Sequence, residues 1–535
     1  MNSNSNLKVS RRKFIGTTLV TAAATASASG AEEIPAATST DVFVYGSTPG
    51  GIAASIEASR RGCRVVLACP KNHPGGMTAS GLCTTDAVRR ELFGGLVEEF
   101  IERVRTLYQK TLGDNNPDYA LTRDGWFYEP SVAEDVFEEM LGEQSDRLTF
   151  LRGHHLSSTK TDGGRVSQVS LVNEKGETIH LVADTFIDGT YEGDLAAQAG
   201  VPFRVGREGR DEFGESLAGI HYMDWKKGSQ IMTPDSGEPS PAIQAYCARS
   251  IFTTDPEKRI PLEKPESYEQ HLPDLLPMID EFETGRVKRR TLGTALPRKK
   301  FQLNGSIVQM TSLNCPGVSW AWPEAERHHR ARLEKFHIDH AASYAWFLQN
   351  HPRVPDHVQA LWKTAGLHRD EFIKNGHWPW QIYVRQGRRI EGREKLTQHS
   401  FVVDPKTGRT PQVEHPIALG EHSFDIHPCH DRRFAIGKWM EGVLWFPKKA
   451  EGPAQPGQIP WGALLPEKLD NLIVPVAMSS THIAMSVLRM EPVWMTTGQI
   501  AGLAAAEAKS QNRSVAQIDP DPLPKKLGIM TKPKV

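Results

Sequence analysis

Residues 41–51 read Asp41-Val42-Phe43-Val44-Tyr45-Gly46-Ser47-Thr48-Pro49-Gly50-Gly51. The apolar run over 41–45 predicts a buried strand, and the glycines after it predict a tight turn into a helix over 52–61 that Gly62 ends. The apolar run over 64–68 predicts a second strand, which a right-handed crossover lays parallel to the first. The sequence therefore predicts a βαβ unit here.

The turn inside this unit matches the dinucleotide-binding fingerprint in part. Gly46 stands where the fingerprint needs a tight turn and Gly51 where it needs close helix packing, and the helix N-terminus suits a pyrophosphate. Thr48 replaces the middle glycine, so its side chain either faces away from the phosphates or contacts them. Cys69 stands where an acidic residue normally holds the ribose, so a plain glycine-rich turn is the alternative. The candidate phosphate-binding residues are Gly46, Thr48, Pro49, Gly50 and Gly51.

Helical spacing of apolar residues follows the βαβ unit. It predicts helices over 89–109 and over 330–349. Another helix is expected to open at Ser131, where Ser131 and Glu134 match a capping box.

The remaining strands are predicted from alternating and apolar runs. Alternation over 148–187 predicts an antiparallel meander that returns the chain to the sheet near Asp188. Residues 471–476 predict a strand, and residues 492–509 a long helix with proline in its first turn. Elements from both ends of the chain are thus expected to build one nucleotide-binding sheet.

The first thirty residues predict a twin-arginine signal peptide. Arg11 and Arg12 precede an apolar run over 16–26 and small residues over 26–28. The run is too short and too rich in threonine and alanine to span a bilayer stably, so a retained transmembrane helix is the weaker alternative and a basic disordered tail the other. We expect the twin-arginine export machinery to carry the folded chain to the periplasm or the medium.

The charge composition argues against nucleic acid as a partner. The 535 residues contain 63 Lys plus Arg against 64 Asp plus Glu, so no charge excess attracts nucleic acid, and a small-molecule substrate fits better. The six cysteines show no CxxC spacing and are too sparse to staple the chain, so we predict free thiols and no metal site.

Several motifs resemble those of secreted bacterial FAD-dependent oxidoreductases. They are Pro74-Gly75-Gly76-Met77-Thr78-Ala79-Ser80-Gly81-Leu82, Asp188-Gly189-Thr190-Tyr191-Glu192-Gly193-Asp194, Tyr383-Val384-Arg385 with Arg388-Arg389, and Arg489-Met490-Glu491-Pro492 through Gly498-Gln499-Ile500-Ala501-Gly502. The resemblance implies an FAD cofactor. By this resemblance, Gly75, Gly76 and Met77 would run beside the isoalloxazine, and residues 188–194 would close the site after the last strand of the meander. The further candidate cofactor-binding residues are Gly75, Gly76, Met77, Asp188, Gly189, Thr190, Asp194, Arg489 and Glu491.

On this basis we predict an α/β fold with two domains. One is a Rossmann-like FAD-binding domain with a parallel sheet and an antiparallel meander, and the other is a larger mixed α+β substrate domain. The expected segments are the signal peptide at 1–30, a linker at 31–40, the discontinuous FAD-binding domain at 41–200 and 460–515, the substrate domain at 201–459 and a tail at 516–535.

The positive charge expected around Pro492 supports a flavin independently of the resemblance. Reduced flavin carries negative charge, which the positive N-terminal end of the helix at Pro492 and the preceding Arg489 could stabilise. An ordinary alanine-rich core helix is the alternative, but it leaves Arg489 unexplained.

His482, Arg489 and Tyr383 are the candidate catalytic residues. His482 lies between the last predicted strand and the helix after it, so it could be the base that takes the substrate's proton. A histidine that only orients the flavin or fills the core is an equal alternative.

An anionic group could be bound by Tyr383, Arg385, Arg388 and Arg389. Exposed ion pairs with Glu391 and Glu394 are the alternative and the favoured one for Arg389. Eleven of the twelve tryptophans follow residue 200, and their faces could line a sugar-binding cleft or fill a large core. Those we singled out are Trp320, Trp322, Trp378, Trp380, Trp439, Trp445 and Trp461.

Together these features predict a flavoenzyme that transfers a hydride from a small organic substrate to FAD. A carbohydrate is one candidate substrate, and the electron acceptor is unknown. A polysaccharide lyase or a carbohydrate-binding protein on a retained nucleotide-binding fold is the alternative.

Overall fold

The computed structural model describes residues 37–224, 237–304, 311–431, 440–445 and 454–532. The predicted signal peptide, with Arg11 and Arg12, lies outside these residues, as does most of the linker. Residues 37–535 form one compact unit. The division into an FAD-binding and a substrate domain stays a prediction.

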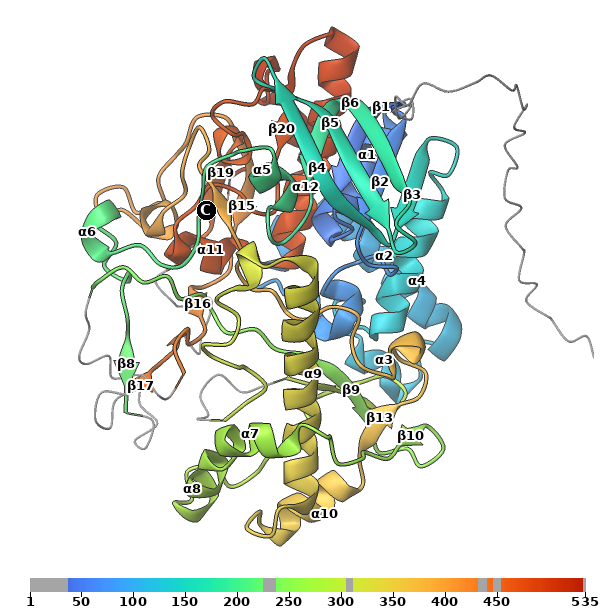
Figure 1. The fold of residues 1–535 in the computed structure, drawn as a ribbon, viewed down its shortest axis with the longest axis vertical. Helices are drawn as coiled ribbons and strands as arrows, with labels where there is room; N and C mark the ends of the chain where they lie inside the picture. The colour runs from blue at the N-terminus through green and yellow to red at the C-terminus, as the bar shows by residue number, and fades with distance from the viewer. Residues whose placement is uncertain (1–36, 225–236, 305–310, 432–439, 446–453, 533–535) are drawn as a thin grey trace, which may run out of the picture. The chain divides into compact units, whose positions relative to one another are not determined.

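A seven-stranded sheet takes its strands from both ends of the chain (Figure 1). The strands are β1 (Thr38–Tyr45), β2 (Val65–Cys69), β3 (Leu148–Arg152), β4 (His154–Asp162), β5 (Arg165–Asn173), β6 (Thr178–Asp188) and β20 (Leu472–Ile473). β1 lies in the middle, parallel to β2 on one side and to β6 on the other. Helix α1 (Pro49–Arg60) connects β1 to β2, so the predicted βαβ unit is confirmed.

The predicted meander is correct in part. β4, β5 and β6 are antiparallel neighbours, whereas β3 pairs in parallel with β2 and extends the parallel half of the sheet. Gly153, with φ +63°, separates β3 from β4. Short alternating runs predict strands but not their partners, which is why β3 was assigned to the meander. β20 lies parallel to the last residues of β6, as expected for a C-terminal strand that joins the same sheet.

Helix α12 (Glu491–Gln511) packs directly on α1. A Cβ on Gly498 would lie 2.0 Å from the carbonyl oxygen of Gly50, and one on Gly502 would lie 2.2 Å from that of Ala54. Both contacts advance by four residues in the same direction, so the two helices run parallel. Both N-termini therefore point toward the carboxyl end of β1, where ligands bind in open α/β sheets.

Two helix boundaries differ from those predicted. Helix α2 spans Leu96–Leu112, because Gly95, with φ +60°, separates it from a short 3₁₀ turn over Arg90–Leu92. The capping box is wrong: α4 spans Pro130–Gly142, and Glu129 precedes its first residue. The Ser131 hydroxyl donates to Glu371, and Glu134 contacts His73, so both side chains have tertiary partners instead.

The rest of the chain adds a five-stranded antiparallel sheet and helices around it. Its strands are β9 (Ser250–Thr253), β10 (Arg259–Ile260), β11 (Thr294–Leu296), β12 (Lys300–Leu303) and β13 (Gly366–His368). Helix α9 (Arg327–Asn350) confirms the helix predicted over 330–349 and runs the length of this region (Figure 1). Further helices, here and elsewhere in the described chain, are α3 (Pro117–Leu121), α5 (Asp194–Gln198), α6 (Arg210–Phe213), α7 (Tyr268–Leu275), α8 (Pro277–Glu283), α10 (Asp356–Lys363), α11 (His482–Leu488) and α13 (Pro522–Lys526).

Short strand pairs complete the described chain. They are β7 (Phe203–Arg204) with β14 (Arg389–Ile390), β8 (Tyr222–Met223) with β17 (Met440–Glu441), β15 (Pro416–Gly420) with β19 (Gly457–Pro460), and β16 (Asp425–Ile426) with β18 (Leu444–Trp445). The parallel-containing sheet and the antiparallel sheets together confirm the predicted α/β fold.

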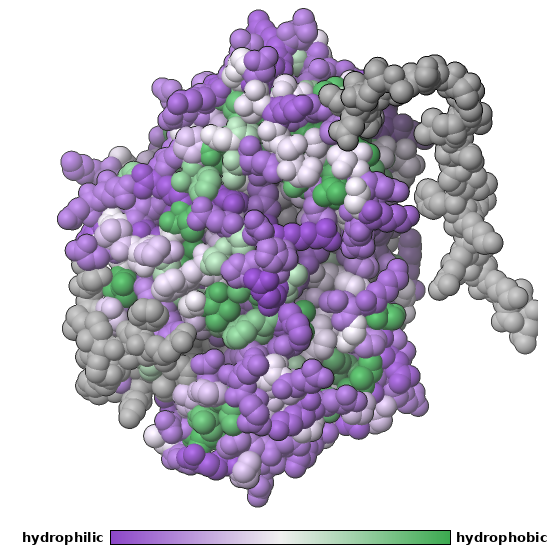
Figure 2. All heavy atoms as spheres, in the orientation of Figure 1, coloured by the Kyte–Doolittle hydropathy of each residue, from purple (hydrophilic) through white to green (hydrophobic). Residues whose placement is uncertain are grey.

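The surface is mainly hydrophilic on the face shown in Figure 2, where apolar residues form small separate groups. Of the large apolar side chains in the described segments, Leu276, Leu361 and Ile373 are exposed. No helix among the described residues is both long and apolar enough to cross a membrane.

Candidate cofactor-binding and active site

A cleft of about 1670 Å³ opens at the carboxyl ends of β1 and β2. It is larger than the roughly 300–1,000 Å³ of most small-ligand pockets, so it has room for a dinucleotide. Its lining comes from the β1–α1 turn, the loop after β2, the segment after β6 and helix α9. The wall residues used below are Ser47, Thr48, Cys69, Lys71, Gly76, Tyr191, Arg330, Glu334 and Arg388.

The glycine turn closes tightly under the cleft. Gly46 has φ +104°, and a Cβ there would lie 2.7 Å from the backbone of Gly189 and Thr190. A Cβ on Gly51 would lie 1.9 Å from the Gly46 carbonyl oxygen, so Gly51 packs against the turn. The Thr48 hydroxyl donates to the Gly189 carbonyl at 2.6 Å and accepts from the Gly51 N–H at 3.3 Å. The Thr48 hydroxyl therefore caps α1 and bonds within the turn, while the residue itself lines the cleft.

Cys69 lines the cleft but offers only a buried thiol, whose sulfur accepts from the Lys71 N–H at 3.4 Å. All six cysteines are buried and free, as predicted. The acidic residue that normally holds the ribose is absent at this position, and charged side chains lie nearby instead. Lys71 pairs with Glu334 of α9 at 2.6 Å, and Arg152 at the end of β3 pairs with Glu138 at 2.7 Å. Sequence reasoning missed these residues, because α9 and β3 come from distant segments.

The loop after β2 brings the Gly75–Met77 motif against the start of α12. The Gly75 N–H donates to the Ser47 carbonyl at 2.9 Å. The Met77 N–H donates to the Tyr191 hydroxyl at 2.9 Å, and that hydroxyl donates to Glu491 at 2.6 Å. Gly76 has φ +49°, and a Cβ there would lie 2.3 Å from the Tyr191 hydroxyl oxygen.

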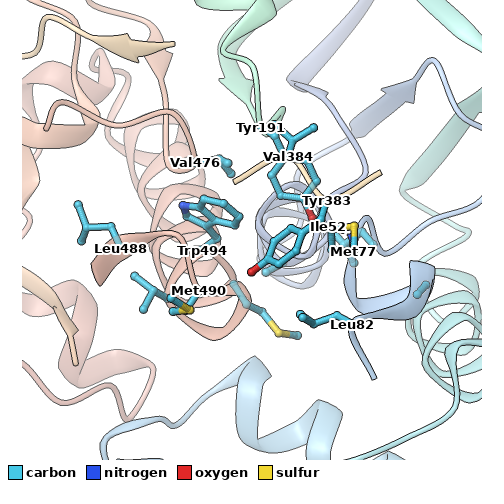
Figure 3. Close-up of a cluster of buried hydrophobic side chains, with 14 of the residues drawn as sticks. Ile52, Met77, Leu82, Tyr191, Tyr383, Val384, Val476, Leu488, Met490 and Trp494 are labelled. Carbon is cyan, nitrogen blue, oxygen red and sulfur yellow. Dashed lines mark hydrogen bonds between the residues drawn. The ribbon is translucent and has the colours of Figure 1, made fainter. Parts of the chain in front are cut away.

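Tyr191 thus joins three segments that are far apart in the chain. Figure 3 shows its side chain gathered with Met77, Tyr383 and Trp494 in a buried cluster beside α12. Tyr191 belongs to the 188–194 motif, but no local pattern distinguishes it from its neighbours there.

Asp188 holds the turn that follows β6, next to the site. Its carboxylate is fully buried and accepts from the Thr190 N–H at 3.0 Å, the Thr190 hydroxyl at 2.6 Å and the Ala196 N–H at 2.9 Å. Desolvation raises the Asp188 pKa to about 6. These contacts fix the turn after β6 rather than face the cleft.

Asp194 faces the cleft and forms ion pairs with two arginines. It pairs with Arg330 of α9 at 2.6 Å and with Arg388 at 2.9 Å. Burial opposes ionisation of Asp194, but the two guanidinium groups outweigh it and lower the pKa of that carboxyl. Arg388 was predicted to bind an anionic group, and the structure places it in this pair.

Glu491 is a buried carboxyl at the first position of α12. Desolvation raises its pKa to about 8, although the Tyr191 hydrogen bond opposes the shift. Its second oxygen and the indole nitrogen of Trp494 have no hydrogen-bond partner among the described residues. Glu491 is therefore mainly protonated at neutral pH and retains an acceptor or donor atom for a ligand.

His482 begins α11, and its ring is 2% exposed. Its backbone N–H donates to Glu208 at 2.7 Å, while neither ring nitrogen has a hydrogen-bond partner in the described chain. Desolvation lowers the His482 pKa well below its usual range, and the charges of Arg207, Arg389 and other neighbours lower it further. The imidazole is therefore neutral. His482 does not line the cleft.

Tyr383 and Arg489 meet in the core. Arg489 donates to the Tyr383 hydroxyl at 3.0 Å and to the Asp425 carbonyl at 2.9 Å, and it pairs with the Asp425 carboxylate at 3.3 Å. Arg385 lies on the Tyr383 ring, 4.5 Å from its centre. These three predicted residues are brought together.

The exposed ion pairs predicted for Arg389 are wrong. Arg389 is 1% exposed and pairs with Glu208 at 2.7 Å. Glu391 pairs with Arg204 and Lys395, and Glu394 accepts from the Gly462 N–H at 3.0 Å. Burial of β14 places Arg389 in the core, which local charge spacing could not indicate.

The tryptophans divide between cleft and core. Trp322, Trp378 and Trp380 line the cleft, whereas Trp461 is buried and Trp320 half-buried outside it. Trp439 and the side chain of Trp445 lie outside the described residues.

One protein family, described as FAD dependent oxidoreductase, matches residues 41–527. The chain belongs to this family. The match begins in β1 and ends just after α13, so it includes the glycine turn, the Gly75–Met77 loop and α12 of the oxidoreductase. No curated protein matches the chain.

Solved structures are similar to the oxidoreductase at low identity. A triple mutant of the flavin-dependent brominase Bmp2 is 11% identical with a TM-score of 0.39, over 91% of this chain and 84% of that one. The myxobacterial chondrochloren halogenase CndH is 14% identical with a TM-score of 0.25, over 42% and 45%. L-proline dehydrogenase from P. horikoshii is 15% identical with a TM-score of 0.18, over 34% and 26%. The oxidoreductase thus spans less than half of these last two chains.

The cleft of the oxidoreductase fits the family's FAD cofactor. Gly46 leaves space for a tight turn at the N-terminus of α1, where a pyrophosphate binds favourably. The partnerless polar atoms of Glu491 and Trp494 stand at the start of α12, on the same side. The glycine turn would hold the phosphates, and the Gly75–Met77 loop with the start of α12 would hold the ring.

Proposed function

We propose that this oxidoreductase takes a hydride from a carbon atom of a small organic substrate. When bound, FAD supplies the two-electron acceptor to which the hydride goes, and a second, unidentified acceptor completes the turnover. The observation that carries the proposal is the Tyr191 link, which joins the Gly75–Met77 loop to the start of α12 beside the glycine turn.

His482 is the base in this proposal. When an alcohol or amine is oxidised, its C–H bond breaks as hydride leaves, its O–H or N–H bond gives up a proton, and a C=O or C=N bond forms. A neutral imidazole with two partnerless nitrogens is able to take that proton at Nδ1 or Nε2. Desolvation, together with the charges of Arg207, Arg389 and Arg489, lowers the His482 pKa, so the imidazolium is a strong acid that releases the proton again.

Arg489 and the N-terminal end of α12 stabilise the negative charge that the cofactor would gain on reduction. The guanidinium is 2% exposed and stands directly before α12. A buried positive charge and the positive end of a helix dipole both act strongly where water is excluded.

A carbohydrate remains one candidate substrate. Its support is the presence of Trp322, Trp378 and Trp380 in the cleft, since aromatic faces pack well on sugar rings. The competing hypothesis is a polysaccharide lyase or carbohydrate-binding protein without redox chemistry. The unusual Thr48 no longer favours it, because its hydroxyl caps α1 and bonds within the glycine turn.

We also propose export by the twin-arginine route to the periplasm or the medium. The support is the Arg11-Arg12 pair followed by the apolar and small residues of the first thirty positions. A route that carries folded proteins suits a chain that takes up a nucleotide cofactor before it is exported.

The test is a substrate screen that follows the flavin spectrum without oxygen. The purified protein should be yellow, and a substrate among alcohols, sugars, sugar acids and amines should bleach it. A colourless protein that refuses FAD in a binding titration, or one that cleaves glycans with no electron acceptor, would contradict the proposal.

A further inference from the structure

Three arginines surround the ring of Tyr383 in the interior. The guanidinium carbons of Arg385, Arg249 and Arg489 lie 4.5, 4.6 and 5.9 Å from the ring centre. Their exposed fractions are 1%, 8% and 2%, in that order. Sequence reasoning missed Arg249, which lies outside every motif.

The positive charge of this cluster is only partly balanced. Arg489 pairs with Asp425, but neither Arg249 nor Arg385 pairs with a carboxylate within the described residues. Arg385 donates to the Ala245 carbonyl and to the Cys247 sulfur, both uncharged. Among the described residues, the Nε atoms of all three arginines have no hydrogen-bond partner. A buried charge without a counter-ion is costly, so the cluster requires an anion.

Other buried arginines show what a balanced site looks like here. Each has its own carboxylate: Arg389 with Glu208, Arg290 with Glu281, and Arg207 with Glu441. Desolvation lowers the pKa of Arg385, and the charges of Arg489 and Arg249 lower it further. The Tyr383 cluster thus departs from the pattern of the rest of the core.

The cluster lies beside the surfaces assigned to the flavin ring. A Cβ on Gly81 would lie 2.3 Å from the Arg249 carbonyl oxygen, so Arg249 packs on the turn that follows the Gly75–Met77 loop. Figure 3 shows Tyr383 pointing into the same buried cluster as Met77 and Trp494. Arg489 stands directly before α12.

We propose that Arg249 and Arg385 bind the carboxylate of the substrate, so that the enzyme oxidises a small organic acid. This inference rests on the proposed function and adds the substrate class to it. Each guanidinium presents two parallel N–H groups that match the two carboxylate oxygens. Asp425 pairs with Arg489, and the charge of Asp86 also acts on Arg489. Arg249 and Arg385 are therefore the members of the cluster left for a substrate carboxylate.

The test uses acetate as the anionic probe and acetamide as its uncharged counterpart. Each is titrated calorimetrically into the FAD-loaded protein, with the flavin absorbance followed in parallel. Acetate should bind and perturb the flavin spectrum, and acetamide should do neither. Arg249→Gln should weaken acetate binding by about 10- to 100-fold, because a charge-assisted hydrogen bond is lost. Arg249→Lys should recover part of it.

Arg353→Gln is the matched control, since Arg353 is exposed and pairs with Glu283 at 2.7 Å. It should leave acetate binding unchanged. The inference is overturned if acetate does not bind, or if Arg249→Gln shifts the flavin reduction potential while acetate affinity stays the same. If acetate binds as expected but no substrate bleaches the flavin, the anion site stands and the proposed oxidation fails.

Discussion

His482 is neutral over the whole range in which an ordinary histidine titrates. Its pKa lies well below the usual 6.5 because the ring is desolvated and because Arg207, Arg389 and Arg489 repel a proton. The rate of flavin reduction should therefore not fall as the pH drops through 6.5. The free energy of unfolding depends on pH in the corresponding direction. Because the unfolded chain binds the His482 proton at a higher pH than the folded chain does, the protein loses stability as the pH falls below the unfolded pKa.

Replacing the imidazole tests its role as base. His482→Gln should slow anaerobic flavin reduction by about 10²- to 10⁴-fold and leave the flavin spectrum nearly intact. His337→Gln is the control, because His337 is equally buried but bonds to Ser319 at 2.9 Å. Unchanged reduction in the His482 variant would mean that another group takes the proton.

At the scale of elements, the close packing of α1 and α12 positions the cofactor site. A methyl group on Gly498 would overlap the Gly50 carbonyl, which is fixed backbone at the start of α1. Gly498→Ala should therefore cost about 1–3 kcal/mol of unfolding free energy and lower FAD occupancy. Thermal unfolding and the ratio of flavin to protein absorbance measure the two effects.

Gly142→Ala provides the matched control for that substitution. Gly142 ends α4, and a Cβ there meets nothing within 4 Å. Alanine should be neutral or slightly stabilising at this helical position. A Gly498 variant that behaves like the Gly142 variant would show that the two helices can separate without harm.

The elements also show what sequence can and cannot predict. β1, α1 and β2 were predicted because the apolar runs and Gly62 are local signals. β3 was misassigned because its partner, β2, is about eighty residues away in the chain. The capping box at Ser131 failed because Glu371 takes that hydroxyl. Arg249 reaches the site only through tertiary packing on Tyr383, so no motif marks it.

At the scale of the whole molecule, export is expected to follow folding and cofactor uptake. Replacing Arg11 and Arg12 by lysine should leave the precursor in the cytoplasm, yellow and folded, because the pair is the proposed export signal and residues 37–535 form a compact unit of their own. Cell fractionation with flavin spectra measures this. Lys13→Arg, which keeps the pair, should be exported normally. Normal export of the double lysine variant would rule out the twin-arginine route.

The pairing of β20 with β6 and the packing of α12 on α1 have a consequence for synthesis. A ribosome that has made the first two hundred residues has produced the glycine turn, but not the helix that packs against it. The nascent chain cannot complete its nucleotide-binding site until α12 has been synthesised, at about residue 511. Chains that terminate before α12 is complete should thus fail to bind FAD and be colourless.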